Sequence, residues 1–161
     1  MPSVRYVFAL FALFLSGPAL AQSDDPARAD TVSWSAQAVT KAGRSTLTVN
    51  AKVQPGWHVY ALKQAAEGPT PLLAALEANS VATANGAVSS SPAITFRDPA
   101  FGLNTQYYEK AFSVTIPVTL KPHLSGPQTI PVSVRFQTCN GRVCQPPKTV
   151  HLSAPLDPAG G

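Results

Sequence analysis

Apolar and polar residues alternate along several stretches of this chain, and a period of two is typical of strands that bury one face. The alternation runs over residues 32–38, 47–53, 112–120 and 132–136, and it is clearest in the third of these stretches. A last short run follows at residues 149–152. These stretches predict β-strands along most of the chain.

Turn-forming dipeptides separate the alternating stretches. They are Pro55-Gly56, Gly68-Pro69, Asn85-Gly86, Ser91-Pro92, Gly126-Pro127 and Asn140-Gly141. Such spacing is typical of an antiparallel meander or Greek key. Residues 71–79 lack a clean helical stripe, so we expect a strand or a single turn there rather than a helix. The pattern predicts an all-β fold, an immunoglobulin-like β-sandwich of about seven to nine antiparallel strands.

Proline, glycine and the charged residues fit this prediction. Sixteen prolines and ten glycines among 161 residues stay below the roughly 25–30% that is typical of a disordered chain. Pro117 and Pro131 cannot donate to a sheet ladder, so we expect them on edge strands or at outward-facing or strand-end positions. Charged residues make up only 12%, so the exposed polarity must come largely from Ser, Thr, Asn and Gln.

The first residues indicate export. Arg5 precedes an apolar run at residues 7–15, and Ala19-Leu20-Ala21 supplies the small-x-small pattern that signal peptidase cleaves. The run is well under the roughly 20 residues that span a bilayer, so we expect no membrane-spanning segment, although an uncleaved anchor is the alternative. The expected parts are a signal peptide (1–21), a disordered leader (22–30), one domain (31–156) and a disordered tail (157–161).

The charge pattern argues against nucleic-acid binding. The formal net charge is +4, yet no two basic residues are adjacent, whereas a nucleic-acid interface needs clustered Lys and Arg. His58, His123 and His151 are scattered, and with two cysteines they give no spacing that is usual for zinc. We therefore expect neither a metal nor a cofactor, and metal handling through the histidines is left as a third functional alternative.

Cys139 and Cys144 are the two cysteines of the chain. In an exported protein such a pair forms a disulfide by default, because the compartment is oxidising. A strand over 132–138 runs into them, and a four-residue loop would set them directly opposite each other on a hairpin, at a distance that a disulfide accepts. If Asn140-Gly141 instead closes a two-residue turn, the cysteines are offset and the bond is strained.

The pair has two possible uses. A bridge over so short a loop is a poor staple, because its chain-entropy stabilisation is only roughly 2 kcal/mol. A local pair in an exposed turn is open to thiol–disulfide exchange, because a partner thiolate can approach one sulfur in line. Arg142 would favour a thiolate there, or is simply a solvated loop charge. The C-x4-C spacing by itself leaves a structural bridge and a redox pair equally open.

The residues around the pair resemble a known family. Phe136-Gln137-Thr138-Cys139 and Cys144-Gln145-Pro146-Pro147-Lys148-Thr149 look like the active-site hairpin of the N-terminal periplasmic domain of DsbD. Three earlier segments occur in the family's order, namely Pro55-Gly56-Trp57-His58-Val59-Tyr60, Gly68-Pro69-Thr70-Pro71-Leu72 and Tyr107-Tyr108-Glu109-Lys110-Ala111-Phe112. The resemblance covers about residues 31–156, but the best-known form of the family has five residues between its cysteines rather than four.

The resemblance implies an immunoglobulin-like periplasmic thiol:disulfide oxidoreductase that works without a cofactor. Its family receives reducing equivalents from a thioredoxin-like domain and passes them to oxidised periplasmic proteins, such as disulfide isomerases and cytochrome c maturation factors. By the same resemblance, Cys144 forms the mixed disulfide with a partner and Cys139 resolves it. The runner-up hypothesis is a non-catalytic β-sandwich binding module in which the bridge only fixes the hairpin.

The family also covers its cysteines with a cap loop that bears an aromatic residue. By order that loop matches residues 98–102, from Asp98 to Gly102, with Phe101 as the shield. The alternative for Phe101 is an ordinary core aromatic. Tyr60 matches a tyrosine near the family's site, although it could equally be core packing. Full-length DsbD continues into membrane and thioredoxin-like domains, whereas this sequence ends at Gly161. The expected partners are therefore thioredoxin-like periplasmic proteins and a separately encoded membrane thiol electron transporter.

Overall fold

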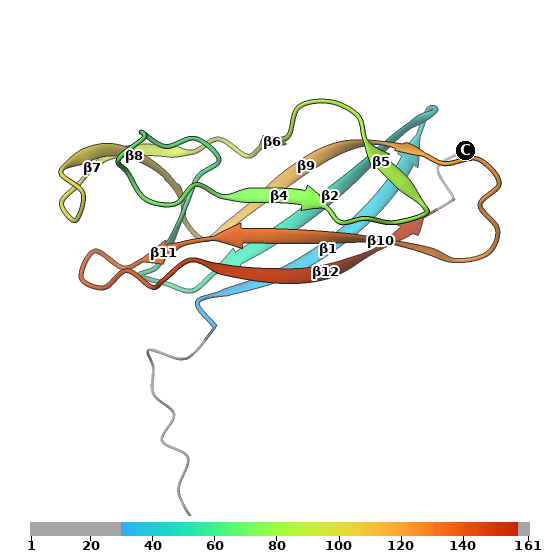
Figure 1. The fold of residues 1–161 in the computed structure, drawn as a ribbon. Coiled ribbons are helices and arrows are strands. Elements are labelled where there is room, and N and C mark those ends of the chain that lie inside the picture. The colour runs from blue at the N-terminus through green and yellow to red at the C-terminus, as the bar shows by residue number, and fades with distance from the viewer. Residues whose placement is uncertain (1–29, 158–161) are drawn as a thin grey trace, which may run out of the picture.

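The computed structural model describes residues 30–157, and the regular structure in this part of the chain consists of strands (Figure 1). The predicted signal peptide, all of the predicted leader except Asp30, and residues 158–161 of the predicted tail lie outside the described residues.

Twelve strands follow one another in this part of the chain. They are β1 (Val32–Lys41), β2 (Arg44–Val53), β3 (His58–Tyr60), β4 (Leu73–Leu76), β5 (Ala82–Ala84), β6 (Ser89–Ser90), β7 (Ile94–Asp98), β8 (Leu103–Tyr108), β9 (Ala111–Leu120), β10 (Gln128–Phe136), β11 (Thr138–Cys139) and β12 (Lys148–Asp157). Five of them, β3 to β6 and β11, have four residues or fewer. The alternating stretches of the sequence correspond to β1, β2, β9 and β10. Within the ambiguous segment 71–79, residues 73–76 form the strand β4.

The strands form two sheets. The larger has the order β4-β10-β12-β1-β2-β9-β5, with β6 also paired to β9, and the smaller has the order β11-β3-β8-β7. The prediction of an all-β, immunoglobulin-like sandwich is confirmed, but the described residues form twelve strands where about seven to nine were expected, because five of the strands are very short. One pairing differs from the expected antiparallel pattern, because β1 and β12 run parallel, with Ala38 opposite Leu156. These two strands come from opposite ends of the domain, so no short hairpin forces them to be antiparallel.

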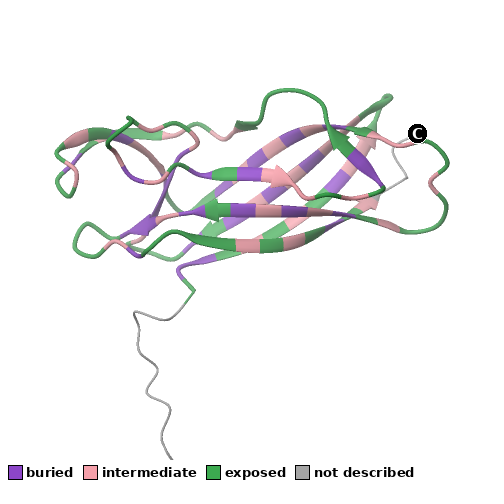
Figure 2. Ribbon diagram, in the orientation of Figure 1, coloured by how far each residue is buried: buried purple, intermediate pink, exposed green. Residues whose placement is uncertain are grey.

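The core follows from the alternation. Figure 2 shows buried positions alternating with half-buried or exposed ones along the long strands. Side chains of successive strand residues point to opposite faces, so one face of each strand is buried and the other meets solvent. The largest fully buried aliphatic side chains are Leu47, Val49, Val59, Val114, Ile116, Ile130, Val132 and Val134.

The two strand prolines occupy positions where no ladder bond is lost. Pro117 lies in β9 and Pro131 in β10, both on the half-buried outer face. Their carbonyls accept hydrogen bonds from the amides of Asn85 (2.8 Å) and Glu77 (3.0 Å), the residues that follow β5 and β4. The N–H and C=O of a strand residue point to the same side, so each missing N–H faces the end of a short strand. This is why strands that are not at the edge tolerate a proline.

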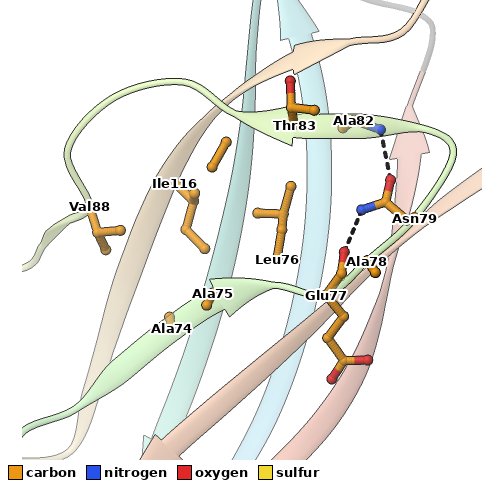
Figure 3. A pocket seen from close by; sticks show the side chains of 11 residues that line it. Ala74, Ala75, Leu76, Glu77, Ala78, Asn79, Ala82, Thr83, Val88 and Ile116 are labelled. Carbon is orange, nitrogen blue, oxygen red and sulfur yellow. Dashed lines mark hydrogen bonds between the residues drawn. The ribbon is translucent and has the colours of Figure 1, made fainter.

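The larger sheet curves until its two ends approach each other. β4 contacts both β5 and β9, although neither is its hydrogen-bonded neighbour. An open groove of about 430 Å³ lies between β4 and these two strands. Figure 3 shows that small and aliphatic side chains such as Ala74, Leu76, Val88 and Ile116 line it. None of the residues that line it belongs to the smaller sheet or to the cysteine hairpin.

Candidate active site at the cysteine hairpin

The two cysteines face each other across a short hairpin. Cys139 ends β11, and it pairs with Cys144 as an antiparallel bridge. The two residues form a disulfide, with their Cα atoms 4.0 Å apart. The structure therefore has the arrangement in which a four-residue loop sets the cysteines directly opposite each other, and not the offset one.

Asn140 and Gly141 shape the turn between the cysteines. The side-chain oxygen of Asn140 accepts hydrogen bonds from the backbone amides of Arg142 (3.0 Å) and Val143 (2.8 Å). The backbone amide of Asn140 donates to the Val143 carbonyl (3.1 Å). Gly141 has a φ of +79°, which a residue without a Cβ adopts at little cost. Arg142 and Val143 are exposed at the tip, so Arg142 stands as a charge in solvent beside the pair.

The two sulfur-bearing residues differ in exposure. Cys139 is only 2% exposed, whereas Cys144 is half-buried. The difference arises because Cys139 lies within the smaller sheet, between β3 and the returning chain, while Cys144 lies beyond the last paired strand of that sheet. An incoming thiol can therefore approach Cys144 more easily than Cys139.

A buried tyrosine lies next to Cys144 and is hydrogen-bonded to a buried carboxylate. The Tyr60 hydroxyl donates a hydrogen bond of 2.7 Å to Asp98 Oδ2 and lies 3.8 Å from Cys144 Sγ. Tyr60 is fully buried and Asp98 is 2% exposed. Burial, and then the hydrogen bond to Asp98, raise the pKa of Tyr60 well above its usual value of about 10. The phenol therefore keeps its proton and presents its oxygen to the sulfur.

The loop from Asp98 to Gly102 is closed by its own first residue. The side chain of Asp98 accepts a hydrogen bond from the amide of Ala100 (2.8 Å), and the carbonyl of Asp98 accepts one from the amide of Gly102 (2.8 Å). Phe101 is half-buried and packs edge-on against Tyr60, with ring centroids 5.8 Å apart. The loop thus packs against Tyr60, and Tyr60 in turn contacts the sulfur of Cys144.

The structure brings most of the predicted site residues together. Tyr60, Asp98, Phe101, Gly102 and Cys144 form one connected group, although they come from β3, the β7–β8 hairpin and the cysteine turn. Figure 1 shows the β7–β8 loop and the cysteine hairpin at the same end of the molecule. Arg142 is the exception, because it lies exposed on the turn, where its backbone amide donates to the side-chain oxygen of Asn140.

His58 belongs to the site, although its residue type and its spacing from the cysteines in the sequence predict no role for it there. In the pairing of β3 with β11, His58 is directly opposite Cys139. The imidazole is surrounded by the rings of Tyr60, Phe96 and Tyr107, at centroid distances of 5.1, 5.8 and 4.8 Å. The spacing of His58 and Tyr60, two residues apart on one strand, is the sequence signal that places both on one face.

The histidines do not converge on a metal site. His151 contacts Glu77 on the larger sheet, and His123 lies in the connection between β9 and β10. Within residues 30–157, no three His, Cys, Asp or Glu side chains gather in a way that could hold a metal ion. The same part of the chain contains no helix long and apolar enough to cross a membrane.

Comparison with known proteins agrees with the geometry. Residues 25–154 match the family model described as "Thiol:disulfide interchange protein DsbD, N-terminal". The chain belongs to this family. Membership of the DsbD N-terminal family implies thiol–disulfide oxidoreductase chemistry, and the bonded pair Cys139 and Cys144 is suited to carry it. No relative was found among curated proteins.

Two solved structures share the fold. One is the N-terminal domain of DsbD from Neisseria meningitidis in the reduced form, with 18% identity and a TM-score of 0.51, covering 76% of this chain and 83% of that one. The other is the N-terminal periplasmic domain of ScsB from Proteus mirabilis, with 21% identity and a TM-score of 0.54. That match covers 81% of this chain and 49% of the ScsB chain. At these identities the likeness concerns the fold.

Proposed function

We propose that this domain is a reversible dithiol–disulfide carrier in the periplasm. It passes reducing equivalents from a thioredoxin-like donor to oxidised periplasmic proteins through Cys139 and Cys144. The unequal exposure of the two cysteines on one short hairpin supports this proposal more than any other observation. A periplasmic location is also supported by the description of the ScsB domain that shares the fold.

The exchange proceeds in two steps. The thiolate of reduced Cys144 attacks a disulfide of the acceptor, forms a mixed disulfide and releases one acceptor sulfur as a thiolate. Cys139 then attacks the sulfur of Cys144, which releases the second acceptor sulfur and forms the Cys139–Cys144 bond. Two electrons pass from the pair to the acceptor, so the acceptor is reduced and the pair oxidised. A thioredoxin-like donor reverses both steps.

The domain is suited to survive this cycle. The cluster of hydrophobic side chains that pack together in the core does not include either cysteine, although Cys139 is itself buried. Opening the bridge therefore removes a short cross-link at the edge of the smaller sheet and leaves the packing between the long strands in place. A carrier needs this property, because it spends part of each cycle reduced.

The surface beside Cys144 fits a protein partner. Val143, the residue before it, is 55% exposed. Apolar side chains near a reactive sulfur provide contact area for a partner whose own cysteine must come within bonding distance. We propose thioredoxin-like periplasmic proteins as these partners, and a membrane thiol electron transporter that supplies the thioredoxin-like donor with electrons.

Trapping tests the proposal. A Cys139→Ser variant lacks the resolving thiol, so it should accumulate a mixed disulfide through Cys144 with an oxidised thioredoxin-like periplasmic protein. The Cys144→Ser variant is the matched control and should trap far less, because its remaining thiol is buried. If neither variant forms an adduct, and if the pair has a reduction potential below about −300 mV, the bridge is structural and the domain is a binding module.

A further inference from the structure

His58 and Cys139 are opposite residues in the pairing of β3 with β11. We propose that His58 is a catalytic residue, the base that accepts the thiol proton of Cys139 when Cys139 resolves the mixed disulfide. The inference rests on the proposed carrier function and adds to it the route of one proton.

The register places the two side chains on one face of the smaller sheet. Directly opposite residues of an antiparallel pair have Cβ atoms about 4.5–5.5 Å apart, so an imidazole can reach the neighbouring sulfur by rotation about its side-chain bonds. His58 is 8% exposed, and its Nε2 is buried without a hydrogen-bond partner among residues 30–157. A buried polar nitrogen without a partner is costly, and such groups in native proteins often have a functional reason.

Cys139 needs a base close to it. At 2% exposure its thiol has little access to water, and a thiolate formed in a buried place is unfavourable unless a cation forms beside it. Transfer of the proton to the imidazole creates a thiolate and an imidazolium together. The pair of opposite charges then replaces a single buried charge.

The surroundings keep the imidazole ready to accept a proton. Burial among the aromatic rings lowers the pKa of His58, and this effect exceeds the opposing influence of the negative charges of Asp98 and Glu109. The other titratable groups that face it are Tyr60 on its own strand and Tyr107 on β8. Burial raises the pKa of both phenols, so both remain protonated and neither serves as a base near neutral pH.

Resolution of the mixed disulfide moves one proton and exchanges one S–S bond for another. The S–H bond of Cys139 breaks and its proton goes to a ring nitrogen of His58, while the sulfur forms a bond to Cys144. The bond between Cys144 and the partner sulfur breaks, and the partner leaves as a thiolate with the electron pair. The imidazolium afterwards releases its proton to that thiolate or to water. In the reverse direction the imidazolium protonates Cys139 as it leaves.

A coloured aromatic disulfide, 5,5′-dithiobis(2-nitrobenzoate), measures the two steps separately. The reduced protein should release one equivalent of the coloured thiolate when Cys144 attacks and a second when Cys139 resolves the adduct. In His58→Phe, which keeps a ring and removes the base, the second phase should slow by about a hundredfold or more, while the first stays within about twofold. The matched control is His151→Gln, which removes an exposed histidine on the larger sheet and should change neither phase.

The pH profile separates a base from a packing residue. In the wild type the rate of the second phase should fall as pH drops through an inflection below the ordinary histidine pKa of about 6.5, because protonated His58 cannot accept a proton. In His58→Phe this inflection should disappear. His58→Gln, which retains a hydrogen-bond acceptor without basicity, should be equally slow and provides the test if the Phe variant does not fold.

Two results are distinguishable as failures. If a folded His58 variant keeps the wild-type rate of the second phase, or keeps its inflection, the role of His58 as a base is wrong and the carrier function stands. If the wild-type protein itself releases only one equivalent or none, the carrier function is wrong, whatever the behaviour of the variants.

Discussion

The phenol of Tyr60 donates a hydrogen bond of 2.7 Å to the carboxylate of Asp98, 38 residues away along the chain. Both residues are buried, and a buried carboxylate is stable only when its oxygens have donors. Asp98 has two such donors, the phenol and the amide of Ala100. The same hydroxyl lies beside Cys144 Sγ, so one side chain contacts both the loop from Asp98 to Gly102 and the cysteine hairpin.

Removing this phenol should destabilise the domain. In Tyr60→Phe one oxygen of Asp98 loses its donor, so the free energy of unfolding should fall by about 1–3 kcal/mol in denaturant titrations of the oxidised protein. The matched control is Tyr108→Phe, which removes a hydroxyl bonded to the neutral side chain of Ser90. This control substitution should lower the free energy of unfolding by only about 0.5–1.5 kcal/mol. Equal losses in the two variants would contradict a special role for the charged partner.

Alkaline pH should weaken the folded state through Tyr60. Its pKa is raised in the folded protein, so above about pH 10 the unfolded chain loses this proton while the folded chain keeps it. The stabilisation that this protonated phenol gives the folded state is complete below about pH 10. It is lost as pH rises further, by at most about 1.4 kcal/mol per pH unit. The free energy of unfolding, measured between about pH 9 and 11, should fall more steeply with pH for the wild type than for Tyr60→Phe. Parallel slopes would show that the phenol titrates alike in both states.

Reduction of the disulfide should leave the domain folded. The bridge closes a short loop, so its loss should lower the free energy of unfolding by only about 2 kcal/mol. Denaturant unfolding of the oxidised and reduced forms tests this, and Cys139→Ser/Cys144→Ser serves as a control that cannot reoxidise. A reduced protein that unfolds under native conditions would mean that the bridge is a structural staple.

The long strands are predictable from the sequence, because each buries one face against the core. The alternation at residues 112–120 matches β9, in which Phe112, Val114, Ile116 and Val118 are buried. The hairpin of β7 and β8 shows no such pattern, since its sheet packs half-buried rings such as Phe96 against Tyr107 instead of a row of aliphatic side chains. The position of a strand in a sequence is thus clearest where the strand faces the main core.

The site is only partly predictable. The number of residues between Cys139 and Cys144 is a local property, and it limits the pair to two arrangements, directly opposite or offset, of which the structure has the first. The pairing of His58 with Cys139 joins residues about 80 positions apart and depends on how β3 meets β11. No local pattern in the sequence encodes that register, so a histidine that reads as a scattered polar residue becomes part of the site only in the folded structure.

Phe101 should control how often the site opens. Its edge-on contact with Tyr60 is worth about 0.5–1.5 kcal/mol beyond buried area, so Phe101→Ala should make the open state of the loop about two- to tenfold more populated. The bridge should then be reduced by dithiothreitol faster by the same factor, which alkylation and mass measurement can follow. Ile94→Ala, on the same hairpin, is the control and removes an exposed apolar side chain. If both variants react at the wild-type rate, Phe101 is an ordinary packing aromatic and access to Cys144 does not depend on this loop.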